Sequence, residues 1–179
     1  MRCLRFGTMV LLLLILTAGL ATDARGEAGR EALKGCKTMA VFVTVSAGGA
    51  ASNMLGVGRS EDGRPWEPLL EEQITSRLRD AGVNVVDVRT SYSSGTAPLL
   101  NVRITILACI GMCFCAVVEM AFKQWALLVD TQPEMRVLAP TWERWNLFAV
   151  SPSACDIPGW VDEFTDKFII DWLRANARE

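Results

Sequence analysis

Apolar residues recur every three or four positions in two segments, and this spacing predicts two amphipathic helices. In residues 66–81 a narrow apolar stripe is followed by Gly82, which is a good helix terminator. In residues 157–177 the apolar face is broader and includes several aromatic side chains. Each helix therefore needs another layer against which to bury one face. The stripe of the first helix consists of Leu70, Ile74, Leu78 and Ala81.

Five further segments are rich in β-branched and apolar residues, or alternate apolar with polar residues, and predict strands. The last of them contains Pro140, which indicates an edge position or a bulge. Two intervening segments, 47–64 and 90–98, are rich in glycine, serine and threonine and predict loops. The predicted strands are residues 38–46, 83–88, 99–109, 114–129 and 135–149.

The predicted elements follow one another in the order β-α-β-β-β-β-α, which indicates an α+β fold. Two helices with one apolar face each can be buried by a common sheet, so we expect a two-layer sandwich. Both helices should pack on one face of a mixed, mostly antiparallel sheet, with the strands at 38–46 and 83–88 parallel. We expect a single domain over residues 38–177, preceded by a disordered N-terminal segment at 22–37.

The first 21 residues are typical of a secretory signal peptide. Arg2 and Arg5 precede an apolar run at residues 9–20, after which small and polar residues follow. As a helix this run would be about 18 Å long, which is short for a hydrocarbon core of about 30 Å, although an uncleaved anchor is the competing interpretation. We expect cleavage after Ala21, or alternatively after Ala24. The mature protein would then be periplasmic or secreted.

Composition excludes several chemistries. The chain contains no histidine, so Ser-His and Cys-His nucleophile pairs and all His-containing zinc sites are absent. Removal of residues 1–21 would leave 16 basic and 20 acidic side chains and no basic stripe, so nucleic acid is a poor candidate partner. The uncharged stretch at 104–118 is shorter than the roughly 20 residues of a membrane span. We therefore expect no enzymatic activity, no cofactor and no transmembrane helix after signal cleavage.

Five cysteines would remain in the mature chain, and their number is odd. In an oxidising compartment we expect disulfides, with one bridge within residues 109–115 and a second between Cys36 and Cys155. Two alternatives stay open: a redox pair, although no C-x-x-C is present, and a soft-metal site with Met112 and Met120 near the thiolates. The cysteines of the cluster are Cys109, Cys113 and Cys115.

Two other groups of side chains suggest function but have simpler explanations. Trp142 and Trp145 could form an aromatic ligand surface, but core and edge packing is the interpretation we favour. Several carboxylates on the last predicted helix could form acid-base pairs, but a solvated helix face explains them better. They are Asp162, Glu163, Asp166 and Asp171.

Several short segments, in the same order, resemble a group of small exported bacterial proteins of unknown function. The layout is also similar to that of envelope assembly and transport auxiliary lipoproteins. The resemblance implies a helix-on-sheet domain without catalytic residues, and the cysteines at 109–115 depart from it. The matching segments are residues 78–83 (LRDAGV), 100–104 (LNVRI), 139–143 (APTWE), 161–164 (VDEF) and 171–176 (DWLRAN).

These observations predict a non-enzymatic exported envelope protein that acts as a binding or assembly accessory. Its partner would be an envelope protein or a lipid. The alternative is a thiol-based protein that binds a soft metal or transfers electrons through Cys109, Cys113 and Cys115.

Overall fold

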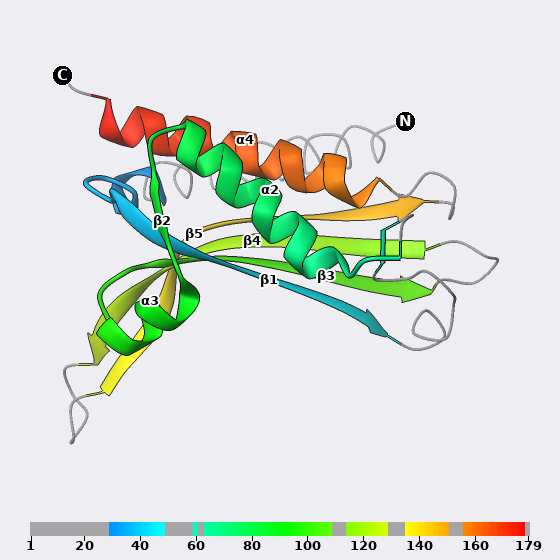
Figure 1. The fold of residues 1–179 in the computed structure, drawn as a ribbon, viewed down its shortest axis with the longest axis horizontal. Coiled ribbons are helices and arrows are strands. Elements are labelled where there is room, and N and C mark those ends of the chain that lie inside the picture. The colour runs from blue at the N-terminus through cyan, green and yellow to red at the C-terminus, as the bar shows by residue number, and fades with distance from the viewer. Residues whose placement is uncertain are drawn as a thin grey trace, which may run out of the picture.

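The structure is a computed structural model that describes residues 29–48, 59–60, 63–108, 114–128, 135–150 and 156–177. Within these ranges one five-stranded sheet carries two long helices on one face (Figure 1). The elements are β1 (Thr38–Gly48), α2 (Trp66–Asp80), β2 (Asn84–Val86), α3 (Val88–Ser94), β3 (Leu99–Ala108), β4 (Phe114–Leu128), β5 (Met135–Val150) and α4 (Ile157–Asn176). No helix in this part of the chain is long and apolar enough to cross a membrane.

The α+β sandwich with α2 and α4 on one face of a mixed sheet is confirmed, and so is the parallel pairing of β1 with β2. The strand order is β2-β1-β3-β4-β5, so β1 also pairs in parallel with β3, and β2 lies at the edge. Half of the four pairings are therefore parallel, which corrects the expectation of a mostly antiparallel sheet. β1 takes the inner position because it is longer and more apolar than β2, which has three residues.

The core lies between the helices and one face of the sheet. Alternate residues of β1, β3 and β4 point toward the helices, as the period of two requires. Aromatic contacts connect α4 to the antiparallel strands, with Phe168 of α4 5.8 Å from Phe122 and 5.0 Å from Trp142 between ring centroids. The sheet residues of this core include Val41, Val43, Val102, Ile104, Val118 and Met120.

A short helix, α3, occupies Val88–Ser94, where a loop over 90–98 was predicted. Its ends carry recognisable signals: the side chain of Asp87 accepts a hydrogen bond from the N–H of Arg89, and Gly95 closes the helix at a φ of +59°. The Ser91 hydroxyl is buried and donates to the carbonyl of Ala97 at 2.6 Å. The prediction was wrong because serine and threonine have low helix propensity, whereas capping and packing stabilise this helix.

Residues 29–37 belong to the folded domain, which corrects the expected disordered segment at 22–37. Residues 29–32 are helical and Leu33 is fully buried in the core. Residues 22–28, like the predicted signal peptide at 1–21, lie outside the described part of the chain. A polar and charged composition concealed Leu33, which docks this segment together with hydrogen bonds from Gln124, Trp172 and Asn176.

The prediction for Pro140 is confirmed in both respects, because β5 is an edge strand and its register shifts beside this proline. Phe122 pairs with Trp142, whereas the next residue, Lys123, pairs with Pro140, so Thr141 is the extra residue. The Thr141 hydroxyl donates to the Phe122 carbonyl at 3.4 Å. Beyond this bulge, β4 and β5 continue as a two-stranded hairpin.

Asp171 connects α4 to β5, which corrects its assignment to a solvated helix face. Asp171 is 7% exposed, and its carboxylate accepts from the indole N–H of Trp142 at 3.1 Å. The Arg144 guanidinium lies 3.5 Å from the same oxygen. Asp162 and Asp166, by contrast, contact the Arg77 guanidinium of α2 at 2.5 and 2.9 Å from partly exposed positions.

We predict that Asp171→Ala lowers the free energy of unfolding by about 2 kcal/mol, because the buried indole N–H of Trp142 loses its acceptor. Asp171→Asn should cost less, since a carboxamide oxygen can still accept that hydrogen bond. Asp166→Ala is the matched control on the same helix and should cost less than about 1 kcal/mol, because its ion pair is exposed. Urea denaturation measures all three, and equal losses for Asp171→Ala and Asp166→Ala would contradict the assignment.

Candidate ligand cleft

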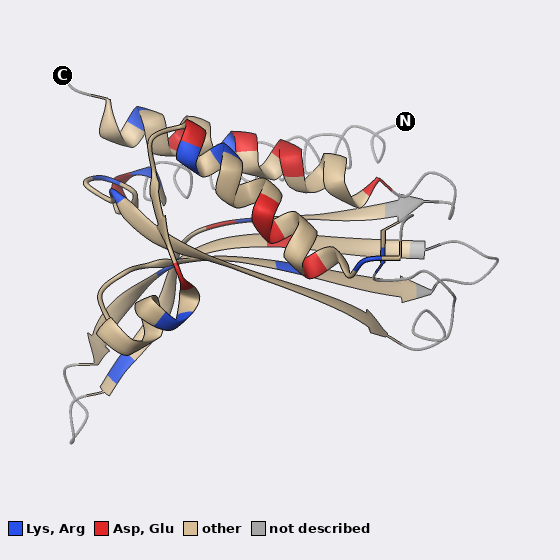
Figure 2. Cartoon of the chain, in the orientation of Figure 1, with Lys and Arg blue, Asp and Glu red and all other residues tan. Residues whose placement is uncertain are grey.

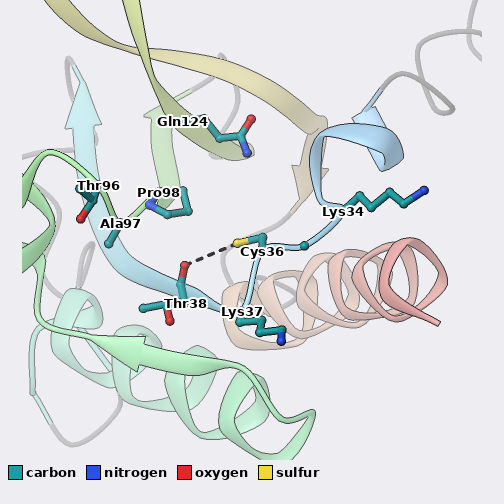
Figure 3. A pocket seen from close by; sticks show the side chains of 9 residues that line it. Lys34, Cys36, Lys37, Thr38, Thr96, Ala97, Pro98 and Gln124 are labelled. Atoms are coloured by element: carbon teal, nitrogen blue, oxygen red, sulfur yellow. Dashed lines mark hydrogen bonds between the residues drawn. The ribbon is translucent and has the colours of Figure 1, made fainter. Parts of the chain in front are cut away.

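A cleft of about 530 Å³ opens where β1 and β3 begin. Its walls come from three places: the segment that leads into β1, the connection between α3 and β3, and the middle of β4 (Figure 3). The cleft is widely open to solvent, so it would hold one group at the surface and not enclose a whole small molecule. The lining residues are Lys34, Gly35, Cys36, Lys37, Thr38, Thr96, Ala97, Pro98 and Gln124.

The wall formed by residues 34–37 is held by the last turns of α4. The Asn176 carboxamide accepts from the N–H of Gly35 at 2.8 Å and donates to the carbonyl of Leu33 at 3.0 Å. The indole N–H of Trp172 donates to the carbonyl of Cys36 at 2.7 Å. Gly35 has a φ of +73°, a conformation that favours glycine. These bonds fix the wall before any ligand arrives.

The opposite walls are equally constrained. The carbonyl of Ala97 accepts from the Ser91 hydroxyl and, at 3.2 Å, from the indole N–H of Trp125. The Gln124 carboxamide donates to the carbonyl of Ala32 at 3.0 Å, which leaves its oxygen as an acceptor. The cleft is thus a feature of the folded backbone and not of long side chains alone.

The charge of the cleft is positive. Two exposed ammonium groups, on Lys34 and Lys37, belong to the lining, which includes no acidic residue. Neither lysine forms an ion pair within the described ranges. Figure 2 shows that acidic side chains follow α2 and α4, whereas several basic ones gather toward the cleft end of the molecule. An anionic group is therefore the ligand that this lining favours.

Cys36 is a free cysteine in the structure, and as a free thiol it is neutral at ordinary pH. It is partly buried, and its S–H donates to the carbonyl of Thr38 at 3.5 Å. Burial raises the pKa of the Cys36 thiol to about 11. Only the thiolate is a strong nucleophile or metal ligand, and roughly one part in ten thousand would be thiolate at pH 7. The cleft therefore offers binding groups but no activated nucleophile.

The two cysteines that the structure describes, Cys36 and Cys115, lie at opposite ends of the sheet. Cys115 pairs in register with Leu107, and Leu107 with Gly48 at the end of β1, whereas Cys36 precedes the start of β1. Cys36 also contacts the C-terminal part of α4 through Trp172, whereas Asp156, which follows Cys155 in the sequence, caps its N-terminus. Cys109, Cys113 and Cys155 lie outside the described residues, so both predicted disulfides stay predictions.

The soft-metal alternative loses one of its predicted ligands. Met120 is fully buried on the helix side of β4, whereas Cys115, an odd number of residues away, lies on the other side. Among the residues that the structure describes, no group of three or more cysteine or carboxylate side chains could hold a metal ion. Met112, like Cys109 and Cys113, lies outside those residues.

The other candidate groups separate into structural and exposed residues. Trp142 is in the core, as core packing predicts, but Trp145 is 68% exposed. The carboxylates of α4 lie away from the cleft and pair with basic groups or with Trp142. Burial, and then the negative charge of Asp87, raises the pKa of Glu71, a carboxyl of α2 that is not part of the lining.

Sequence reasoning missed the cleft because most of its lining seemed to belong to a disordered segment or a loop. The available signal was Leu33 between charged residues, followed by Gly35 and the first strand. No protein-family model matches the sequence, and no significant match to a curated protein was found. The geometry of the site therefore carries the functional argument.

We predict that Cys36 reacts slowly with iodoacetamide at pH 7 and that its rate rises steeply as the pH approaches 11. The raised pKa keeps the thiol protonated until well above the ordinary range of a cysteine. Peptide mass spectrometry after timed alkylation of the intact protein measures this rate at Cys36 itself. The same protein in urea is the control, and equal rates with and without urea at pH 8 would contradict the burial effect.

Proposed function

We propose that the chain is an exported, non-enzymatic binding protein whose cleft takes an anionic group. The observation that carries the proposal is the preformed cleft. Its lining includes Lys34 and Lys37, contains no acidic residue, and has a neutral thiol at Cys36. Ammonium groups, together with the hydroxyls of Thr38 and Thr96, suit carboxylate or phosphate oxygens. An assembly or accessory role in the cell envelope fits such a binding activity and fits the signal sequence at residues 1–21.

The absence of histidine from the chain supports binding over catalysis. A general base or an activated nucleophile needs a group that titrates near the working pH. In the cleft, the Cys36 thiol, whose pKa is raised by burial, supplies neither role. The thiol-based alternative would have to depend on Cys109, Cys113 and Cys115. Of these the structure describes Cys115, which lies at the other end of the sheet from the cleft.

We predict that inorganic phosphate stabilises the protein and that Lys34→Ala/Lys37→Ala abolishes this stabilisation. A ligand that binds the folded state at ten times its dissociation constant stabilises it by about 1.4 kcal/mol. Thermal unfolding in phosphate and in chloride at equal ionic strength measures the effect. Arg79→Ala, which removes an exposed charge from α2, is the matched control and should retain it.

Two outcomes would contradict binding in the cleft. One is a wild-type protein whose unfolding temperature is the same in phosphate and chloride. The other is a double variant that phosphate stabilises as strongly as the wild type. In either case the two lysines would be part of an ordinary solvated surface.

Export makes a separate prediction. Protein recovered from the cell envelope or the medium should begin at Thr22, or at Arg25 if cleavage follows Ala24. Intact-mass spectrometry with thiols alkylated beforehand reports the start of the chain and the number of free thiols together. A chain that retains residues 1–21 in every fraction would exclude a cleaved signal and favour the anchor.

A further inference from the structure

We infer that the β4–β5 hairpin and the basic residues around the cleft form a surface that docks on an anionic lipid bilayer. The inference rests on the proposed function for the roles of Lys34 and Lys37. It goes beyond that function by assigning a membrane surface to the hairpin, of whose described residues only Gln124 belongs to the cleft lining. Two independent features of the same end of the domain support it, one apolar and one electrostatic.

The apolar feature is a hairpin that projects from the sheet (Figure 1). β3 pairs with β4 as far as Lys123, so residues 124–128 pair with β5 alone. At about 3.4 Å per residue this two-stranded part extends the sheet by roughly 15 Å. Its side chains are large and exposed: Leu127 by 47%, Leu128 by 40% and Met135 by 53%.

Both faces of the hairpin carry these apolar side chains. Leu127 pairs with Arg136 and Leu128 with Met135, and successive residues of a strand point to opposite faces. A flat protein surface could cover one face of such a projection. A bilayer can contact side chains of both faces, because the apolar groups of a peripheral protein bury about 5–10 Å deep at the boundary between headgroups and acyl chains.

An aromatic pair supports the base of the hairpin. Tyr92 of α3 packs edge-on against Trp125, with 5.9 Å between ring centroids, and Tyr92 is 52% exposed. The Trp125 indole donates to Ala97, which lines the cleft, so hairpin and cleft are connected by one hydrogen bond. Tyrosine and tryptophan are the residues enriched at the membrane–water interface.

The electrostatic feature is a set of basic side chains without ion pairs in the described ranges. They surround the hairpin and the cleft, whereas the guanidinium of Arg77 and the ammonium of Lys167 on the helices are paired with carboxylates. Basic side chains without ion pairs in the described ranges lie next to the apolar hairpin. Anionic lipid headgroups attract such positive charges, and the apolar side chains can enter the layer beneath them. The set consists of Lys34, Lys37, Arg89, Lys123 and Arg136.

Four acidic residues neighbour the five basic ones along the chain, and two of the four are described in the structure. Glu31 is exposed beside the cleft wall, and Asp87 is engaged as the N-cap of α3. The segment that joins the two strands contains Asp130 and Glu134 and lies outside the described residues. The inferred surface therefore consists of the strand residues on either side of that segment and not of the segment itself.

The test is sedimentation of the mature protein with vesicles. Wild type should bind vesicles of one part phosphatidylglycerol to two parts phosphatidylcholine at least tenfold more tightly than pure phosphatidylcholine vesicles, and high salt should remove the difference. Leu127→Thr/Met135→Thr keeps β-forming residues and should weaken binding at least tenfold. Leu147→Thr, at a 54% exposed position of the same strand, is the matched control and should bind like wild type.

Further variants separate this inference from binding of a free anion. Lys123→Gln/Arg136→Gln should weaken vesicle binding and leave stabilisation by phosphate unchanged, whereas Lys34→Ala/Lys37→Ala should remove the phosphate effect. If phosphate stabilises the protein but vesicles do not bind it, the cleft takes a soluble anion and the membrane inference is wrong. Equal binding by the hairpin variant and the wild type would also overturn it.

A second copy of the chain is the competing occupant of the apolar hairpin. Analytical ultracentrifugation without lipid distinguishes the two, because a membrane-docking hairpin leaves the protein monomeric. A dimer that dissociates on Leu127→Thr/Met135→Thr would assign the surface to self-association and overturn the inference.

Discussion

The fold depends on two indole N–H groups that find their acceptors only when α4 is in place. Trp142 donates to the Asp171 carboxylate, and Trp172 donates to the backbone carbonyl of Cys36. A buried donor without an acceptor is costly, so β5, α4 and the segment before β1 adopt their positions together. The cleft wall is consequently set by the last helix of the domain, although that helix contributes no lining residue.

Much of the architecture could be predicted from the sequence because the long elements each have a strong pattern. The stripe of α2, the alternation in β3 and the proline at the bulge of β5 are local signals with local causes. The order of the strands in the sheet has no such local signal in the sequence. β1 lies between β2 and β3 because it is long and carries apolar side chains on both faces. These properties decide its position only by comparison with the other strands, since an inner strand must be covered on both sides.

The site was harder to predict than the fold, for a related reason. The cleft is formed by backbone segments between elements, and single side chains hold them: Leu33 in the core, Ser91 beneath α3, and Asn176 against Gly35. Single residues of this kind produce no helix or strand periodicity in the sequence, so a pattern search does not find them. The prominent sequence feature is the cysteine cluster at 109–115. Its one described member, Cys115, pairs with Leu107 at the opposite end of the sheet.

The distribution of charge separates the molecule into two parts with different roles. On α2 and α4, carboxylates hold Arg77 and Lys167 in inter-residue contacts that stabilise the helical layer. At the cleft end, Lys34, Lys37 and Arg136 remain without such partners in the part of the chain that the structure describes. A net charge of −2 thus conceals a strongly polarised surface.

The position of β1 also determines when the domain can fold. This strand emerges first from the ribosome, but its two neighbours come later, with Ala40 pairing with Val86 and with Leu99. The core is then closed by α4, the final element. Contacts between such distant parts of a chain make folding slow, because the intervening loop must be closed before they form. A growing chain of this sequence therefore cannot complete the described core until α4 (Ile157–Asn176) has left the ribosome.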